Sequence, residues 1–337
     1  MFTHHRLHRR ISSIALTAAI ACGQEPLPFR DPSPHRVQLV AVEDGVQLEV
    51  LDWGGTGRPI ILLAGYLTAH AYDDFAPKLS QIGHVYGITR RGLGASSRPD
   101  SGYTAQRSAE DVLQVLTALK LTSPVLAGHS FGGQDLSTLG ANYPNRIAGL
   151  VYLNSAEDPT LKFSDYGVEP GDGGKLPAAM RSPPAPDLRS FPAYRAWQVQ
   201  THGVAFPEPE LRHLYAANPD GTMGRYLPPK NVRDAMAASL VKPDYARIRI
   251  PVLAFFAAPR PFEEEMQRFP PRNAEERAAM EHKFKVDLAI KNRHILDLKT
   301  GVPAARVIEL PQSNFYIFLS NEADLLREMR PFVVALK

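Results

Sequence analysis

The order of apolar and polar positions predicts a chain in which strands and helices alternate. Residues 37–53 alternate in hydrophobicity on either side of Asp44-Gly45, a pair that favours a tight turn, so they predict a β-hairpin. Further strands are predicted at 58–65, 84–92, 123–130 and 147–155. The segments with helical spacing of apolar residues are 72–81, 108–121 and 132–143.

The pattern changes after residue 158. Residues 159–246 hold 13 of the chain's 30 prolines and show no alternation of strand and helix. Alternation resumes with a strand at 247–258, a helix from about Asn273, a strand at 305–310 and a final helix at 323–337. This order predicts a doubly wound, mostly parallel α/β sheet whose core comprises 37–158 and 247–337, with 159–246 inserted as a helical cap.

The N-terminal residues have the layout of an export signal. Three arginines precede an apolar run from Ile11 to Ala21, which is too short to span a bilayer. We expect residues 1–21 to be removed, residues 22–36 to form a linker, and the protein to be exported. Removal lowers Lys+Arg from 38 to 35 against 35 Asp+Glu, so the sequence pI of about 8.9 gives no support for nucleic-acid binding.

Cys22, the only cysteine, leaves two outcomes of export open. Cleavage after Ala21 would release the protein to the periplasm or the medium. Alternatively, residues 19–22 resemble a lipoprotein cleavage box, and a lipid on Cys22 would then anchor the chain to the envelope. A single cysteine excludes a disulfide framework, and the sequence leaves the oligomeric state open.

Ser130 lies inside GHSFG, between a predicted buried strand and a predicted helix. A G-x-S-x-G turn between strand and helix strains the serine backbone and holds its hydroxyl at the carboxyl edge of the sheet. Gly128 and Gly132 leave room for that turn. The helix that follows points backbone N–H groups at developing negative charge.

With these residues the chain resembles the α/β-hydrolase-fold superfamily, in particular its cap-bearing serine esterases and haloalkane-dehalogenase-like proteins. The segment LLAGYLTAH, residues 62–70, is similar to the family's oxyanion loop, and RRGLGASSRP, residues 90–99, to its Arg-Gly-x-Gly-x-Ser segment. The resemblance implies Ser130 as nucleophile, the N–H groups of Tyr66 and Phe131 as oxyanion hole, and an acyl-enzyme from a small, apolar ester. The resemblance implies no metal and no cofactor. A haloalkane dehalogenase uses a carboxylate as its nucleophile, so a serine at position 130 disfavours that activity.

Two residues depart from the family pattern at the triad positions. Asn154 stands where an acid is expected after the sixth strand of the family's sheet, and Phe315 stands where the catalytic histidine is expected in the loop before the last helix. Glu157 is the first substitute for the acid. A solvated loop carboxylate is an equally good interpretation of it.

His70, five residues after Gly65 of the segment similar to the oxyanion loop, is the best-placed substitute base at the correct edge of the sheet. His202 and His213 of the insertion remain open, whereas His294 is expected roughly 30 Å along its helix from the site. Two hypotheses therefore follow: a secreted serine hydrolase with a relocated or impaired base, or a non-catalytic relative that binds an acyl or apolar ligand. Turnover of a p-nitrophenyl ester separates them.

Overall fold

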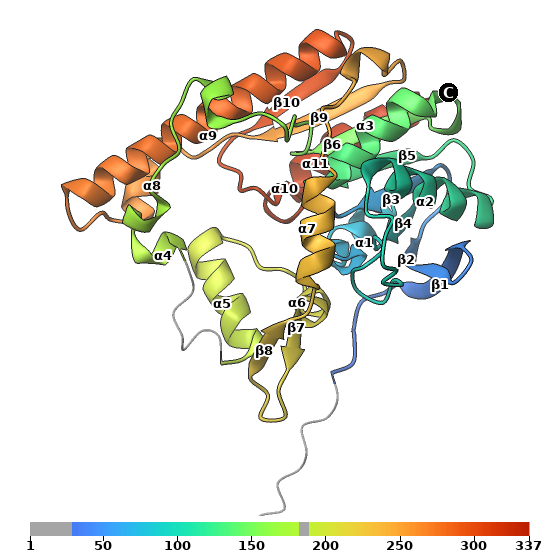
Figure 1. Ribbon diagram of the computed structural model, residues 1–337, viewed down its shortest axis with the longest axis horizontal. Helices are drawn as coiled ribbons and strands as arrows, with labels where there is room; N and C mark the ends of the chain where they lie inside the picture. Colours follow the sequence, from blue (N-terminus) through green and yellow to red (C-terminus); the bar gives the residue numbers. More distant parts are fainter. Residues whose placement is uncertain (1–28, 182–188, 337) are drawn as a thin grey trace, which may run out of the picture. The chain divides into compact units, whose positions relative to one another are not determined.

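The computed structural model describes residues 29–181 and 189–336, and its described part contains one large, mostly parallel sheet (Figure 1). The strand order is β1-β2-β4-β3-β5-β6-β9-β10. β1 pairs antiparallel with β2 and β2 antiparallel with β4, while the remaining neighbours are parallel. The strands are β1 Arg36–Glu43, β2 Val46–Gly54, β3 Pro59–Leu63, β4 His84–Ile88, β5 Val125–His129, β6 Gly149–Leu153, β9 Val252–Ala257 and β10 Arg306–Leu310.

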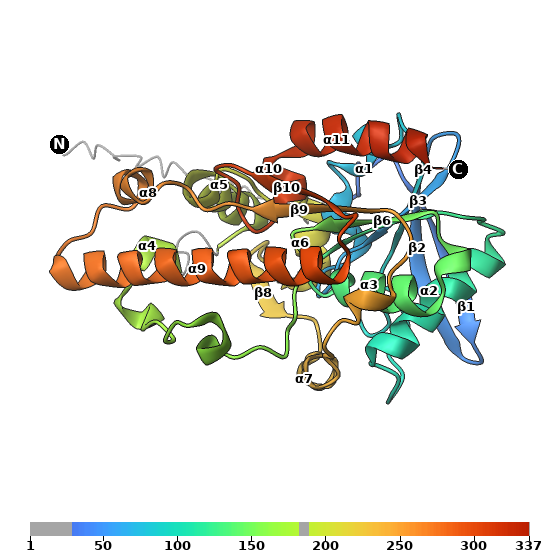
Figure 2. The same ribbon diagram turned by 90° about the horizontal axis from the view of Figure 1, so that it is seen from above.

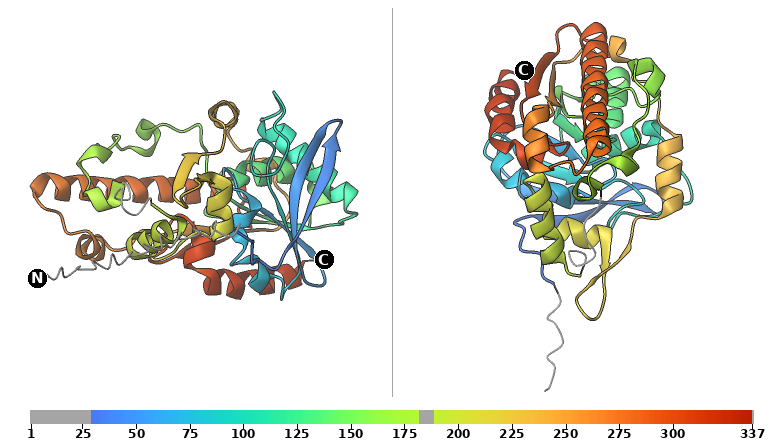
Figure 3. Two further views of the ribbon diagram at one scale, coloured as in Figure 1. Left: turned by 90° about the horizontal axis from the view of Figure 1, so that it is seen from below. Right: turned by 90° about the vertical axis from the view of Figure 1, so that its left-hand side faces the viewer.

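Helices cover both faces of this sheet, and the side chains of successive residues in a strand pack on opposite faces. In β3, Ile61 and Leu63 pack with α2, α3 and α9, whereas Ile60 and Leu62 pack with η1, α1 and α11. Figures 2 and 3 show the long α9 and the red α11 on opposite sides of the sheet. These helices are η1 Ala69–Tyr72, α1 Ala76–Leu79, α2 Ala105–Ala118, α3 Gly132–Asn142, α9 Ala274–Gly301 and α11 Glu322–Ala335. The predicted doubly wound α/β fold is confirmed.

The regular elements in the described part of 159–246 are mostly short helices, but they also include a hairpin that the sequence pattern did not predict. The two-stranded sheet pairs β7 with β8 in antiparallel orientation. The elements are η3 Phe163–Tyr166, η4 Gly173–Lys175, α4 Ala178–Arg181, α5 Phe191–His202, α6 Glu208–Leu214, β7 Tyr215–Ala217, β8 Met223–Tyr226 and α7 Lys230–Ala238. The boundaries predicted for the insertion stay a prediction.

Two contacts bring the inserted segment to the edge of the sheet where the site was predicted. Val232 and Met236 of α7 form a buried cluster with Phe131, which follows β5. The Phe206 ring, which precedes α6, lies 4.7 Å from the Tyr316 ring in the loop after β10. The insertion thus packs against both predicted site loops.

Several element boundaries differ from the sequence prediction. The helix predicted over 72–81 is two short elements, η1 and α1, because Pro77 has no N–H and occupies the first turn of a new helix. α8, Phe262–Arg268, and α10, Ile317–Ser320, were not predicted. The predicted leader and Cys22 lie outside the described residues. Among those that the structure does describe, no helix is long and apolar enough to cross a membrane.

Candidate active site

Ser130 occupies a strained turn between β5 and α3. Its φ is 52°, in the left-handed region that side chains other than glycine rarely adopt. A Cβ on Gly128 would lie 2.9 Å from the backbone of Gly132, and a Cβ on Gly132 would clash with the carbonyl oxygen of Leu63. Both glycines of GHSFG are therefore required by close backbone approach, and Ser130 itself is half-buried.

The loop after β3 lies directly against this turn. Gly65 has a φ of 65°, and a Cβ on it would lie 2.9 Å from the backbone nitrogen of Phe131. The Tyr66 and Phe131 rings meet edge to face at 5.0 Å. Among the described residues neither the Tyr66 N–H nor the Phe131 N–H donates a hydrogen bond. The two amides predicted as an oxyanion hole therefore lie on adjoining loops and have no acceptor.

Asn154 joins the loops that follow β6, β9 and β10. Its Nδ2 donates to the carbonyl oxygen of Phe315 at 3.3 Å, and its Oδ1 accepts from the Ala257 N–H at 2.9 Å. Like Ser130 it has a positive φ, 55°. The two positions at which an acid and a histidine were expected are thus in direct contact, through an amide-to-backbone hydrogen bond.

The Nε2 of His129 also forms a hydrogen bond with the carbonyl oxygen of Phe315, at 3.0 Å. Its ring is buried among Phe315, Tyr316 and Phe318. Burial lowers the pKa of His129 to about 4. The imidazole is therefore neutral near pH 7, and its Nε2 is occupied by the hydrogen bond to the Phe315 loop.

His70 is buried in a different network, with only 3% of its surface exposed. Nδ1 lies 3.1 Å from Asp73 Oδ2, and Nε2 lies 3.6 Å from Glu49 Oε1. Burial by itself lowers the pKa of His70, but hydrogen bonds to Asp73 and Glu49 together with their charges raise it to about 10. A protonated imidazole accepts no proton, and no described contact of His70 involves Ser130, so these surroundings do not suit it to the role of general base. His213 stacks on the His70 ring at 4.2 Å.

Glu157 lines a cavity of about 490 Å³ together with Asn154 and Phe315. Burial raises the pKa of Glu157 to about 7, and among the described residues it has no hydrogen-bond or ion-pair partner. A carboxyl group with this pKa is only partly ionised at neutral pH. Glu157 therefore lies next to the expected acid position, but burial weakens it as an orienting carboxylate.

His294 lines the same cavity, although Ser130 is not among the residues of that lining. The expected distance between His294 and Ser130 therefore stays a prediction. The C-terminal half of α9 carries His294 to the cavity. Its Nε2 lies 3.1 Å from the Tyr166 hydroxyl, and burial lowers its pKa. His202 from α5 reaches the cavity as well. The direction in which α9 crosses the sheet edge has no signal in the local sequence.

Comparison with known proteins identifies the family. Residues 60–306 match the model of the alpha/beta hydrolase family. The chain belongs to this family. It is 30% identical over 248 residues to the AB hydrolase superfamily protein YisY of Bacillus subtilis, a match that covers 68% of this chain and 85% of that one.

Other similarities are shorter or concern the fold alone. The bifunctional esterase/perhydrolase DCH of Acinetobacter calcoaceticus is 30% identical to this chain over 125 residues. The match covers 36% of this chain and 45% of the relative. The chain spans about half the length of several curated relatives that it matches. The crystal structure of E-2-(acetamidomethylene)succinate hydrolase superimposes with a TM-score of 0.62 at 18% identity, covering 89% of this chain and 100% of that one.

Proposed function

We propose that the protein is an exported serine hydrolase that cleaves small carboxylic esters through an acyl-enzyme on Ser130. The observation that carries this proposal is the strained Ser130 turn with two unpaired amides, of Tyr66 and Phe131, on adjoining loops. Backbone strain of this kind costs roughly 1–3 kcal/mol and persists where the surrounding structure enforces it. Retention of the whole arrangement supports catalysis more than a scaffold role.

In this mechanism Ser130 Oγ attacks the ester carbonyl carbon and forms a C–O bond. The carbonyl oxygen becomes negative, and the Tyr66 and Phe131 N–H groups stabilise it. The alcohol leaves with a proton, and water then cleaves the acyl-enzyme to the acid and free Ser130. Because Phe315 and Asn154 replace the usual base and acid, the serine proton passes to water or to a weaker base, and we expect the reaction to be slow.

We take the cavity beside Phe315 and Asn154 as the pocket for a small, largely apolar substrate, and Ser130 is not itself among its lining residues. Its wall includes aromatic side chains from α8, α9 and the neighbouring loops, and a volume of about 490 Å³ suits a small molecule. Arg260 in the same wall has no described ion-pair partner. The esterase activity in the name of the Acinetobacter calcoaceticus relative agrees with the proposed reaction type.

Hydrolysis of p-nitrophenyl acetate and butyrate by the wild type and by Ser130→Ala tests this function. We expect slow turnover that disappears in Ser130→Ala, and labelling of Ser130 by a fluorophosphonate in the wild type alone. A folded Ser130→Ala variant that retains wild-type turnover would contradict the proposal.

A second candidate function is binding of an acyl or apolar ligand without turnover. It is favoured by the Phe315 phenyl ring, which is 46% exposed and lines the cavity in place of an imidazole. Tight binding of a fatty acid or of an ester product, with no labelling of Ser130 and no turnover, would select this alternative.

Export is proposed from the N-terminal sequence. Intact-mass measurement of the protein recovered from the envelope and the medium should show loss of residues 1–21. A diacylglyceryl mass on Cys22 would establish the anchored form and a free Cys22 thiol the released form. Recovery of the uncleaved chain from the cytoplasm would exclude both.

A further inference from the structure

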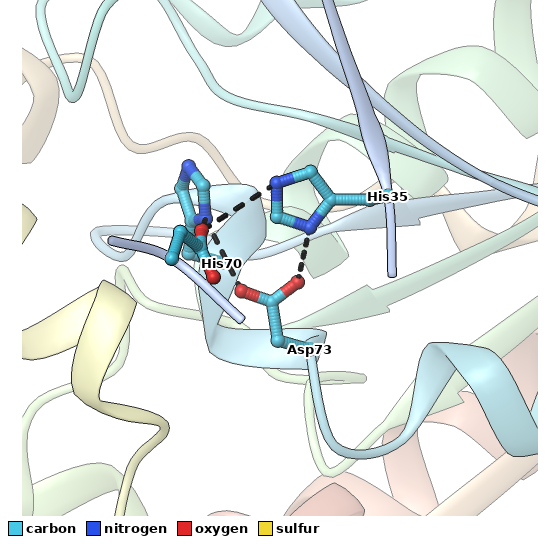
Figure 4. A group of neighbouring side chains, drawn as sticks. His35, His70 and Asp73 are labelled. Carbon is cyan, nitrogen blue, oxygen red and sulfur yellow. Dashed lines mark hydrogen bonds and ion pairs between the residues drawn. The ribbon is translucent and has the colours of Figure 1, made fainter. Parts of the chain in front are cut away.

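A cluster of histidines and carboxylates lies where the chain enters the fold, and the proposed catalysis does not use it. Asp31 and His35 precede β1, and His70 and Asp73 belong to η1 and the residue after it. One ligand atom from each of the four lies within 4.8 Å of every other. Figure 4 shows the rings of His35 and His70 turned towards the Asp73 carboxylate.

We propose that Asp31, His35, His70 and Asp73 bind a divalent transition-metal ion, with zinc as the best fit. The ligand atoms are Asp31 Oδ2, His35 Nε2, His70 Nδ1 and Asp73 Oδ2. This site is independent of the function proposed for Ser130. Two imidazoles and two carboxylates form a donor set that suits zinc and its neighbours, whereas calcium and magnesium prefer oxygen ligands alone.

Three of the six distances between these atoms are close to the spacing in a tetrahedral zinc site. Zinc bonds of about 2.0–2.1 Å place neighbouring ligand atoms roughly 3.3 Å apart. Asp31 Oδ2 lies 3.6 Å from His35 Nε2 and 3.5 Å from His70 Nδ1, and His70 Nδ1 lies 3.1 Å from Asp73 Oδ2. Asp31 is therefore already near zinc-ligand spacing from both histidines, and His70 from Asp73.

The hydrogen bonds around the two imidazoles leave the required nitrogens facing the site. His35 Nδ1 donates to Asp73 Oδ1 at 2.8 Å, so its Nε2 lone pair faces Asp31. His70 Nε2 faces Glu49, and its Nδ1 faces Asp31 and Asp73. Metal-binding histidines typically donate their second N–H to a carboxylate in this way. The Nδ1 of His70 lies 3.1 Å from Asp73 Oδ2, a hydrogen bond in which the nitrogen donates, so zinc binding has to displace that proton. Trp53 Nε1 also donates to Asp73 Oδ1, at 3.0 Å, and fixes that carboxylate.

The cluster has an excess of negative charge that a divalent cation would neutralise. Three carboxylates, of Asp31, Asp73 and Glu49, lie within 3.6 Å of the His70 ring nitrogens. Glu49 Oε2 is buried without a hydrogen-bond partner. The side chains of His35, His70, Glu49 and Asp73 are at most 4% exposed, while that of Asp31 is 29% exposed. Asp31 thus lies on the side from which an ion enters.

A competing set, Glu49, His70 and His213, is a poorer site. The rings of His70 and His213 are stacked at 4.2 Å with an interplanar angle of 20°. Nitrogen lone pairs lie in the ring plane, so those of two nearly parallel rings do not converge on one ion. The His35 and His70 rings, by contrast, are inclined at 69°, which allows their lone pairs to meet.

The test is zinc binding by the untagged full chain after removal of metals with a chelator. His35→Gln removes one ligand nitrogen and retains an amide that can donate to Asp73. His84→Gln is the matched control, because His84 also pairs with an aspartate, Asp52 at 2.8 Å, outside the cluster. Asp31→Asn, at the more exposed ligand, is a second variant that keeps the test valid if His35→Gln does not fold.

We expect one zinc ion per chain by elemental analysis, and a rise of several degrees in the melting temperature on zinc addition. His35→Gln and Asp31→Asn should weaken zinc binding at least about a hundredfold, since loss of partners outside the ligand set alone costs about 10–100-fold. His84→Gln should bind like the wild type. His4, His5 and His8 are replaced by alanine in a further control, because these leader residues could bind zinc themselves.

Four results would overturn the proposal. These are absence of stoichiometric zinc in the wild type, equal binding by His35→Gln and His84→Gln, loss of the bound zinc on replacement of the three leader histidines, and preference for calcium or magnesium over zinc.

Discussion

Asn154 uses both ends of its amide, one to donate to the Phe315 carbonyl and one to accept from the Ala257 N–H. An aspartate at this position retains the acceptor but loses the donor, and it faces the carbonyl oxygen with a negative charge. We therefore expect Asn154→Asp to lower the free energy of unfolding by about 1 kcal/mol, the usual contribution of one such hydrogen bond.

Urea unfolding measures this change, with the exposed Asn145→Asp as control. The control should differ from the wild type by less than about 0.5 kcal/mol, as surface substitutions usually do. Equal stabilities of the two variants would mean that the Asn154 bridge contributes nothing.

At the residue scale, the buried Glu157 also predicts that the stability of the protein depends on pH. Burial raises its pKa from 4.5 to about 7, so between these values the folded protein keeps a proton that the unfolded chain has lost. The contribution of Glu157 to stability therefore falls as the pH rises from about 4.5 to about 7. Above that range the buried charge disfavours the folded state, and Gln at this position removes the penalty.

We expect Glu157→Gln and wild type to have equal melting temperatures near pH 4.5 and the variant to be more stable at pH 8. Thermal unfolding of both proteins across this range gives the difference, and the exposed Glu263→Gln serves as control. A gap that does not change with pH would show that burial does not perturb this carboxyl group.

Single residues were predictable from sequence where backbone constraints specify them. Ser130, Gly128 and Gly132 form a pattern whose meaning follows from the turn itself. The cavity contact of His294 was not predictable, because it depends on where a helix passes other elements. The same holds for the ion network around His70.

At the scale of elements, the loop after β3 packs closely against the Ser130 turn after β5 because Gly65 has no side chain. Gly65 and Gly45 both have positive φ, 65° and 74°, but only Gly65 lies against other backbone. Alanine in the left-handed region costs roughly 1–2 kcal/mol. We expect Gly45→Ala to show that cost alone and Gly65→Ala to cost more, because its Cβ also meets the Phe131 nitrogen.

Urea unfolding of these two variants separates backbone strain from close packing, and esterase assays show whether the loop after β3, the proposed oxyanion loop, has moved. Gly45→Ala should leave turnover unchanged, while Gly65→Ala should lower it. A Gly65→Ala variant as stable and active as Gly45→Ala would contradict the close approach of the two loops.

Elements with strong local signals were predicted, and those that depend on neighbours were not. The hairpin β1–β2 turns at Asp44-Gly45 as expected, and the buried strands β3, β5 and β6 follow their apolar runs. The β7–β8 hairpin lies among prolines and short polar stretches and has only 3 and 4 residues per strand, too few for a clear period of two. α8 begins after Pro261 within a segment that reads as a loop.

At the scale of the whole molecule, the inserted segment contacts the loops at the edge of the sheet near Ser130. α7 packs on Phe131, Phe206 contacts Tyr316, and a fully buried Glu210 of α6 accepts a hydrogen bond from the Thr68 N–H at 3.2 Å in the loop between Tyr66 and His70. The inserted segment therefore lies against the loops that carry Tyr66, Phe131 and Tyr316, the loops to which the proposed function assigns the oxyanion hole and the missing imidazole.

The most direct test restores that imidazole. Turnover of p-nitrophenyl acetate is measured for wild type, Ser130→Ala, Phe315→His and Phe315→His/Asn154→Asp, each checked for folding by circular dichroism. We predict slow wild-type turnover that requires Ser130, and a gain of at least about tenfold in Phe315→His, since a well-placed base contributes about 10²–10⁴-fold. The double variant should be faster still, because its carboxylate can accept the imidazole N–H. Wild-type turnover that survives Ser130→Ala, or folded histidine variants with no gain, would contradict the account.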